Sequence, residues 1–166
     1  MNQKQSVLTP QMIFRPTVFW LTAAGLGLLR PGPGTWGSAG ALAFWWFFLS
    51  GLAWPVQLAI VLVYFLISWW LCNRLIEQLE IKDEPQIVAD EVAGMWLALV
   101  WLPQSIGWYL AAFVLFRVAD IFKPGPIGVL DRNLHSGLGI MADDMLAGGL
   151  TALALALAGV ALSIMS

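Results

Sequence analysis

The chain has 166 residues, of which 60% are hydrophobic and only 11% are charged, and its formal net charge at pH 7 is −2. Soluble domains usually carry about 25% charged residues, so this composition indicates a surface that largely faces lipid. The near-neutral balance and the lack of a basic run argue against a nucleic-acid-binding protein.

Apolar runs separated by turns predict an all-α fold, a polytopic helical bundle integral to the membrane. A polar N-terminal segment, residues 1–16, precedes an apolar helix at 17–29. This helix is short for a span, which needs roughly 20 residues, so we expect it to lie in the interface or to re-enter the membrane. No repeat is visible, and residues 1–166 are expected to form a single membrane-embedded domain. About four to five longer helices are expected to span the membrane, at 38–54, 56–73, 86–102, 106–122 and 142–164.

Alternation of these spans gathers the charged segments on one side of the membrane. If 38–54 crosses and each later helix reverses direction, the turns at 51–55 and 103–107 lie on the opposite side, and neither contains a charged residue. The positive-inside rule makes the charged side cytoplasmic. The charged segments are 30–38, 74–91, 117–132 and 143–144.

Two acidic pairs begin apolar helices: Asp90-Glu91 and Asp143-Asp144. Small residues at four-residue steps let membrane helices approach closely, so we expect the two acidic groups to meet. Favourable interaction with the helix dipole is the simpler explanation for either pair alone. The small residues that follow Asp90 and Asp144 at this spacing are Gly94 and Ala98, and Gly148 and Ala152.

A further carboxylate, Asp120, lies three residues after Arg117 and three before Lys123. Such spacing also fits a ladder of salt bridges along one helix face. Oxygen ligands without a Cys-His cluster suit Mg²⁺ rather than Zn²⁺, with Mn²⁺ as the alternative. The candidate metal ligands, which are also the candidate catalytic acids, are Asp90, Glu91, Asp120, Asp143 and Asp144.

Basic and hydroxyl side chains in the same segments are candidates for binding phosphate. Arginine offers a bidentate fork to phosphate oxygens. The Gly/Pro-rich segment 30–38 opens a helix whose free N–H groups can hold an anion, although it can equally be only a turn. The single histidine, His135, is either a structural donor or a catalytic general acid or substrate contact. The phosphate candidates are Arg30, Thr35, Ser38, Arg117, Lys123 and Arg132.

Three blocks together resemble the phosphatidylglycerophosphatase A family: Arg30–Ser38, Ile87–Trp96, and Arg117–Gly149 with its KPGP, DRNLH and GIMADD motifs. The family typically has Trp before Asp-Glu, where this chain has Ala89, and a second Gly after the His, where it has Ser136-Gly137. Neither departure touches a candidate ligand.

The resemblance implies a Mg²⁺-dependent enzyme of the bacterial inner membrane. Its implied partners are membrane lipids and the substrate phosphatidylglycerophosphate, which it would convert to phosphatidylglycerol and inorganic phosphate. Neither nucleic acid nor an obligate protein partner is expected.

The expected mechanism is attack by water activated by a carboxylate-held metal, with Arg117, Lys123 and Arg132 offsetting charge in the transition state. An aspartyl-phosphate intermediate is the competing route. A non-enzymatic transporter or lipid-binding protein is the alternative class, although a transporter is expected to carry mid-helix charges and inverted repeats. A phosphatidyltransferase would need an Asp-Gly…Ala-Arg…Asp pattern, and a histidine phosphatase a second His; the sequence has neither.

Overall fold

The computed structural model describes residues 8, 10–79, 84–125, 127–128 and 137–165, and across these residues the fold is all-α, without a strand. This confirms the all-α part of the predicted fold class. The elements in chain order are η1 (Pro10–Phe14), α1 (Pro16–Leu21), η2 (Leu26–Leu28), α2 (Pro33–Phe44), η3 (Trp45–Leu49), α3 (Trp54–Leu79), α4 (Ala89–Leu99), α5 (Ile106–Phe122) and α7 (Gly137–Met165). Elements η1 and η2 are 3₁₀ helices, and η3 is a π-helical turn that continues α2.

The expected helix at 17–29 is instead two short helices, so this prediction was wrong. Helix α1 ends at Leu21, and Ala23, Ala24 and Gly25 follow with positive φ angles of 48°, 58° and 92°. The Thr22 hydroxyl donates to the Val18 carbonyl at 2.7 Å and accepts from the Gly25 amide at 3.2 Å. Threonine can divert backbone groups in this way, but alanines in an apolar run gave no indication of a turn.

The later helices follow the predicted runs with shifted ends. Helix α5 has the predicted bounds, whereas α3 continues past residue 73 through Arg74 and Glu77. Helix α7 begins at Gly137, five residues before the predicted start at residue 142. The amide of Gly137 donates to Asn73 Oδ1 at 3.0 Å, so a side chain from α3 satisfies a free donor at the start of α7.

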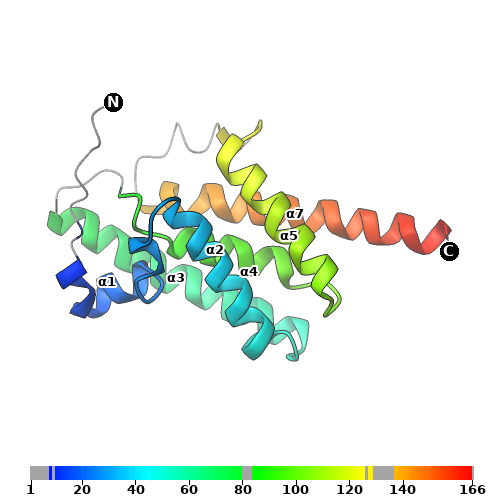
Figure 1. The fold of residues 1–166 in the computed structure, drawn as a ribbon, viewed down its shortest axis with the longest axis horizontal. Helices are drawn as coiled ribbons and strands as arrows, with labels where there is room; N and C mark the ends of the chain where they lie inside the picture. Colours follow the sequence, from blue (N-terminus) through cyan, green and yellow to red (C-terminus); the bar gives the residue numbers. More distant parts are fainter. Residues whose placement is uncertain (1–7, 9, 80–83, 126, 129–136, 166) are drawn as a thin grey trace.

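Helix α4 lies at the centre of the bundle (Figure 1) and packs against α2, α3, α5 and α7. Nine of its 11 residues are buried. Its length corresponds to about 16 Å of helix, and each of the four helices that contact it is longer. The surrounding core includes Trp45, Met95, Tyr109 and Phe116, all fully buried. The carboxylates in the first turn of α4 therefore stand inside the bundle.

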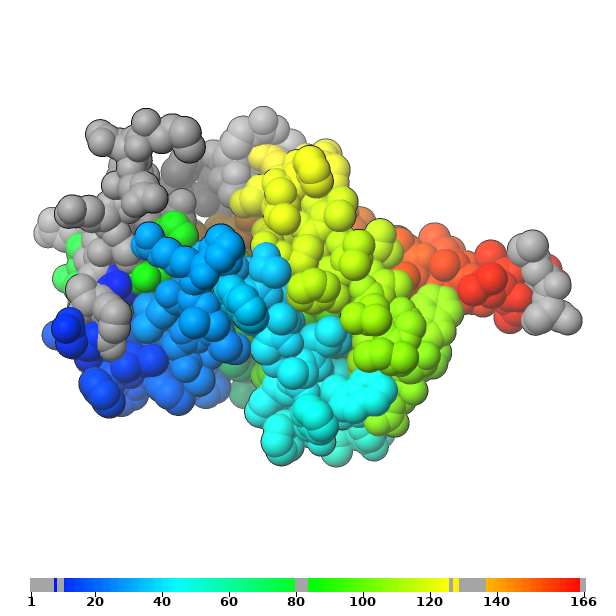
Figure 2. Space-filling view, in the orientation of Figure 1, coloured from blue at the N-terminus to red at the C-terminus, as the bar shows by residue number. Residues whose placement is uncertain are grey.

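Two described helices, α3 and α7, are long and apolar enough to cross a membrane, and only 22% and 28% of their most apolar windows are buried. This finding does not confirm the expected number of four to five spans. The last turns of α7 extend beyond the rest of the molecule (Figure 2). They expose apolar side chains such as Leu157, Val160 and Leu162. An apolar surface of this kind is compatible with contact to lipid.

Candidate metal and phosphate site

Glycines allow the backbones of α4 and α7 to come into direct contact. A methyl group on Gly148 would overlap the Gly94 carbonyl, and one on Gly94 would overlap the carbonyl of Asp144. Each glycine lies one helical turn from an acidic residue, Asp90 on α4 and Asp144 on α7. The expectation that small residues bring the two acidic groups together is therefore confirmed.

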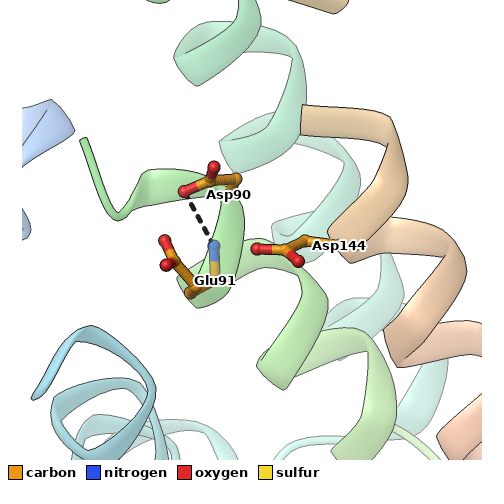
Figure 3. A group of neighbouring side chains, drawn as sticks. All are labelled: Asp90, Glu91 and Asp144. Atoms are coloured by element: carbon orange, nitrogen blue, oxygen red, sulfur yellow. Dashed lines mark hydrogen bonds between the residues drawn. The ribbon is translucent and has the colours of Figure 1, made fainter. Parts of the chain in front are cut away.

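Three carboxylates converge at this contact. Asp90, Glu91 and Asp144 each offer one oxygen atom, and these atoms lie within 4.8 Å of one another. Figure 3 shows the Asp144 side chain on α7 pointing toward the first turn of α4, which carries the other two. Asp90 and Asp144 are buried, with exposed fractions of 8% and 3%. Asp90 Oδ1 accepts a hydrogen bond from the Glu91 amide at 3.0 Å.

The chemistry of these donors fits a divalent cation. The carboxyl group of Asp90 lies close to that of Glu91, and the carboxyl group of Asp144 interacts electrostatically with that of Asp120. Buried acids this close repel when ionised unless a proton or a cation lies between them. Glu91 Oε2 is buried and has no hydrogen-bond partner among the described residues. An all-oxygen, anionic cluster of this kind can hold a metal ion.

Arg117 joins α2 and α5 beside the carboxylates. Its Nη1 atom lies 2.6 Å from Asp120 Oδ2 and donates to Ser38 Oγ at 3.3 Å. The Ser38 hydroxyl in turn donates to the Gly34 carbonyl at 2.8 Å. Arg117 Nε is buried without a partner in the described part of the chain. The guanidinium is thus fixed by two helices and still has a free donor.

Lys123 connects the end of α5 to the start of α7. It takes a left-handed conformation, with φ of 45°, and its Nζ atom lies 2.6 Å from Asp143 Oδ2. The other oxygen of Asp143 accepts a hydrogen bond from the Asp144 amide at 3.0 Å. One oxygen of Asp143 therefore pairs with Lys123, while its neighbour Asp144 points into the three-carboxylate group.

The predicted site residues differ in how the structure places them. Asp90, Glu91 and Asp144 converge, Asp120 contacts Asp144, and Ser38, Arg117, Lys123 and Asp143 form the polar contacts around them. Arg30 and Thr35 are exposed, and no described hydrogen bond or ion pair links them to the carboxylates. The predicted residues Arg132 and His135 lie outside the described residues.

Sequence reasoning missed Asn73, which holds the start of α7 against α3. A methyl group on Gly137 would overlap the Asn73 amide oxygen, so the two residues touch directly. Asn73 follows the buried Cys72 and ends a long apolar run. An amide at the end of such a run is a signal of a polar contact, because an unpaired amide would be costly there.

The sequence of this chain is similar to those of known proteins. A family model described as phosphatidylglycerophosphatase A matches residues 19–159. The phosphatidylglycerophosphatase A of Escherichia coli (strain K12) is 40% identical over 129 residues, which cover 77% of this chain and 74% of that protein. The phosphatidylglycerophosphatase A of Haemophilus influenzae is 41% identical, covering 74% of this chain and 76% of that protein.

A third relative carries a different name. A Bacteroides thetaiotaomicron protein named provisionally as a phosphatidylinositol-3-phosphatase is 36% identical over 135 residues, covering 76% of this chain and 83% of that protein. No solved structure matches the chain.

Proposed function

This chain belongs to the phosphatidylglycerophosphatase A family of phosphatases, and we propose that it hydrolyses phosphatidylglycerophosphate to phosphatidylglycerol and inorganic phosphate. The observation that carries the proposal is the convergence of Asp90, Glu91 and Asp144 beside a fixed arginine. Carboxylates that hold a cation, together with a guanidinium, provide what the hydrolysis of a phosphate monoester requires.

The proposed division of roles follows the contacts. Asp90, Glu91 and Asp144 hold Mg²⁺, with Mn²⁺ as the alternative, and when bound the ion supplies Lewis-acid activation of the phosphate ester. Arg117, oriented by Asp120 and Ser38, offsets the charge that develops on the phosphate oxygens. Asp120 and Asp143 remain candidate ligands, and Arg30, Thr35, Lys123 and Arg132 remain candidate phosphate contacts.

In the proposed reaction a water oxygen forms a bond to phosphorus as the bond to the glycerol oxygen breaks. The attacking water releases a proton, and the departing glycerol oxygen takes one, for which His135 is the candidate donor. An aspartyl phosphate is the competing route, in which a carboxylate attacks first. Acid-quenched protein that retains labelled phosphate from the substrate would favour the aspartyl route, and protein without label would favour direct attack by water.

We also propose that the protein is a multi-pass protein of the bacterial inner membrane, with its site facing the cytoplasm. The starts of α2, α4 and α7 and the end of α5 gather at one end of the bundle (Figure 1), where the charged contacts lie. A cysteine introduced at Thr35 or at Gly51, in a protein whose own Cys72 is replaced by serine, tests this orientation. In intact cells an impermeant maleimide should label the Gly51→Cys protein, and should label Thr35→Cys only after permeabilisation.

Phosphate release by the purified protein in detergent tests the activity itself. Phosphatidylglycerophosphate and phosphatidylinositol 3-phosphate are compared, each with Mg²⁺ and with EDTA. We expect Mg²⁺-dependent release from phosphatidylglycerophosphate. Faster release from the inositol lipid would assign the other substrate, and no release from either lipid would support a transporter or a lipid-binding protein.

A further inference from the structure

An apolar pocket of about 360 Å³ lies between the N-terminal helices and the centre of the bundle. It is bounded by α1, η2, α2, α3 and α4, and its walls include Phe19, Leu26, Phe44 and Val92. No charged residue lines it. The pocket is distinct from the carboxylate cluster, none of whose residues contributes to its walls.

The polar atoms of the aromatic side chains around this pocket already have partners. Trp20 Nε1 donates to Ser68 Oγ at 2.9 Å, and the same serine hydrogen bonds the Tyr64 hydroxyl. Trp96 Nε1 donates to the Ala41 carbonyl at 3.0 Å. The pocket therefore offers hydrocarbon and ring surface to an occupant. A polar ligand would lose its hydrogen bonds to water there without gaining new ones, whereas an alkyl chain has no hydrogen bonds to lose.

The pocket and the candidate site share two helices. On α4, Val92 of the pocket directly follows Glu91 of the site. On α2, Gly40 and Ala41 of the pocket follow Ser38 by two and three residues, a rise of about 3 to 4.5 Å. A lipid with its terminal phosphate beside Arg117 could therefore place one of its acyl chains in the pocket.

We propose that this pocket receives one acyl chain of the lipid substrate while the phosphate head lies at the carboxylates. This inference rests on the proposed function, because it assigns the chain to the same substrate. Binding of an acyl chain there would make the pocket a determinant of affinity for long-chain lipids. The chemical step depends on the carboxylates and Arg117, so it should not require the pocket to be filled.

Gly40 offers a way to fill the pocket with little other change. A methyl group there would meet only the end of the flexible Leu26 side chain, so Gly40→Leu should project into the pocket without moving the backbone. Gly107→Leu is the matched control, because Gly107 is also helical and only Ser105 Oγ, at 3.9 Å, lies near its missing Cβ.

Both variants and the unaltered protein are assayed with Mg²⁺ on two substrates that share the headgroup. One is long-chain phosphatidylglycerophosphate in detergent, and the other is its soluble dibutyryl analogue. Gly40→Leu should raise KM for the long-chain lipid about 10-fold and leave kcat/KM for the dibutyryl analogue within twofold, whereas Gly107→Leu should change neither. A long-chain KM like that of the control, or an equal loss on both substrates, would overturn the inference.

The result also separates this inference from the proposed function. If the unaltered protein releases phosphate from neither substrate, the proposed function fails. The pocket is then tested by photo-crosslinking with a phosphatidic acid that carries a diazirine in one acyl chain. Crosslinks to α1, η2 or α2 that Gly40→Leu removes would support chain binding, and crosslinks that this variant leaves unchanged would exclude it.

Discussion

The Glu91 carboxylate lies directly against Gly34, and a methyl group on that glycine would overlap Glu91 Oε1 and come within 3.1 Å of Arg117 Nη1. The first turn of α2 thus forms one wall of the candidate metal site. Gly34→Ala should displace the Glu91 carboxylate and raise the Mg²⁺ concentration for half-maximal activity roughly 10-fold, an effect of the size seen when support around a metal ligand is lost. A Mg²⁺ titration of phosphate release measures it.

The control for this variant is Gly107→Ala, which adds the same methyl group to a helical glycine where it would meet only Ser105 Oγ, at 3.9 Å. It should keep the original Mg²⁺ requirement. If Gly34→Ala also kept that requirement, Glu91 would not be a ligand, or the wall formed by α2 would not determine its position.

Neighbouring glycines on α7 provide a second test. The missing Cβ of Gly148 would overlap the backbone of Gly94, whereas that of Gly149 would only reach Leu97 at 3.9 Å. Gly148→Ala should push α7 away from α4, at a cost of about 1 to 3 kcal/mol in the free energy of unfolding, and should separate Asp144 from Asp90. Gly149→Ala should be neutral or slightly stabilising, because alanine favours the helix.

Thermal unfolding and phosphate release of the two alanine variants check this prediction together. A loss of about 1 kcal/mol corresponds to roughly 2 to 4 °C in Tm for a chain of this size. Equal behaviour of the two variants would show that the contact between Gly94 and Gly148 does not hold the site together.

The contact between α4 and α7 was predictable from the sequence because both helices carry the same spacing of small residues. Glycine and alanine at four-residue steps after Asp90 and after Asp144 indicate two close-packing faces, and each face carries its acid. The pairing of Lys123 with Asp143 was not predictable, because it depends on the left-handed turn at Lys123 that ends α5. The same holds for Asn73, whose partner is 64 residues away along the chain.

The contact between Lys123 and Asp143 provides a third prediction. The Asp143 side chain is only 6% exposed and that of Lys123 is 30% exposed, so the pair is better shielded than a surface salt bridge. A double-mutant cycle with Lys123→Met and Asp143→Asn should give a coupling energy of about 1 kcal/mol in unfolding. No coupling, with a raised KM on Lys123→Met, would instead assign the lysine to the substrate phosphate.

Metal binding should be measurable without turnover. Mg²⁺ should raise Tm in detergent, because an ion bound only by the folded protein stabilises it. In EDTA, Asp144→Asn should unfold at a higher temperature than the original protein, since one charge leaves a crowded buried group. The same variant should lose the Mg²⁺-dependent rise in Tm. A rise of unchanged size would exclude Asp144 as a ligand.

The N-terminal region marks the limit of sequence reasoning for the fold. Its apolar run predicts one helix, but the hydrogen bonds of the Thr22 hydroxyl stabilise a turn there. A hydropathy pattern does not reveal such hydrogen bonds. The pocket beside α2 depends on this turn, because η2 follows it and supplies Leu26 to the pocket wall. The carboxylates, by contrast, were evident from the cost of acidic residues in apolar helices.

We propose that carboxylates from α4 and α7 jointly hold the metal used for hydrolysis. The most direct measurement is Mg²⁺-dependent phosphate release from phosphatidylglycerophosphate by Asp90→Asn and by Asp144→Asn, with the exposed Glu77→Gln on α3 as control. Each site variant should lose at least about 100-fold in kcat/KM, since loss of even an indirect metal partner costs 10- to 100-fold. The control should keep full activity. Normal Mg²⁺-dependent turnover by both site variants would contradict the account.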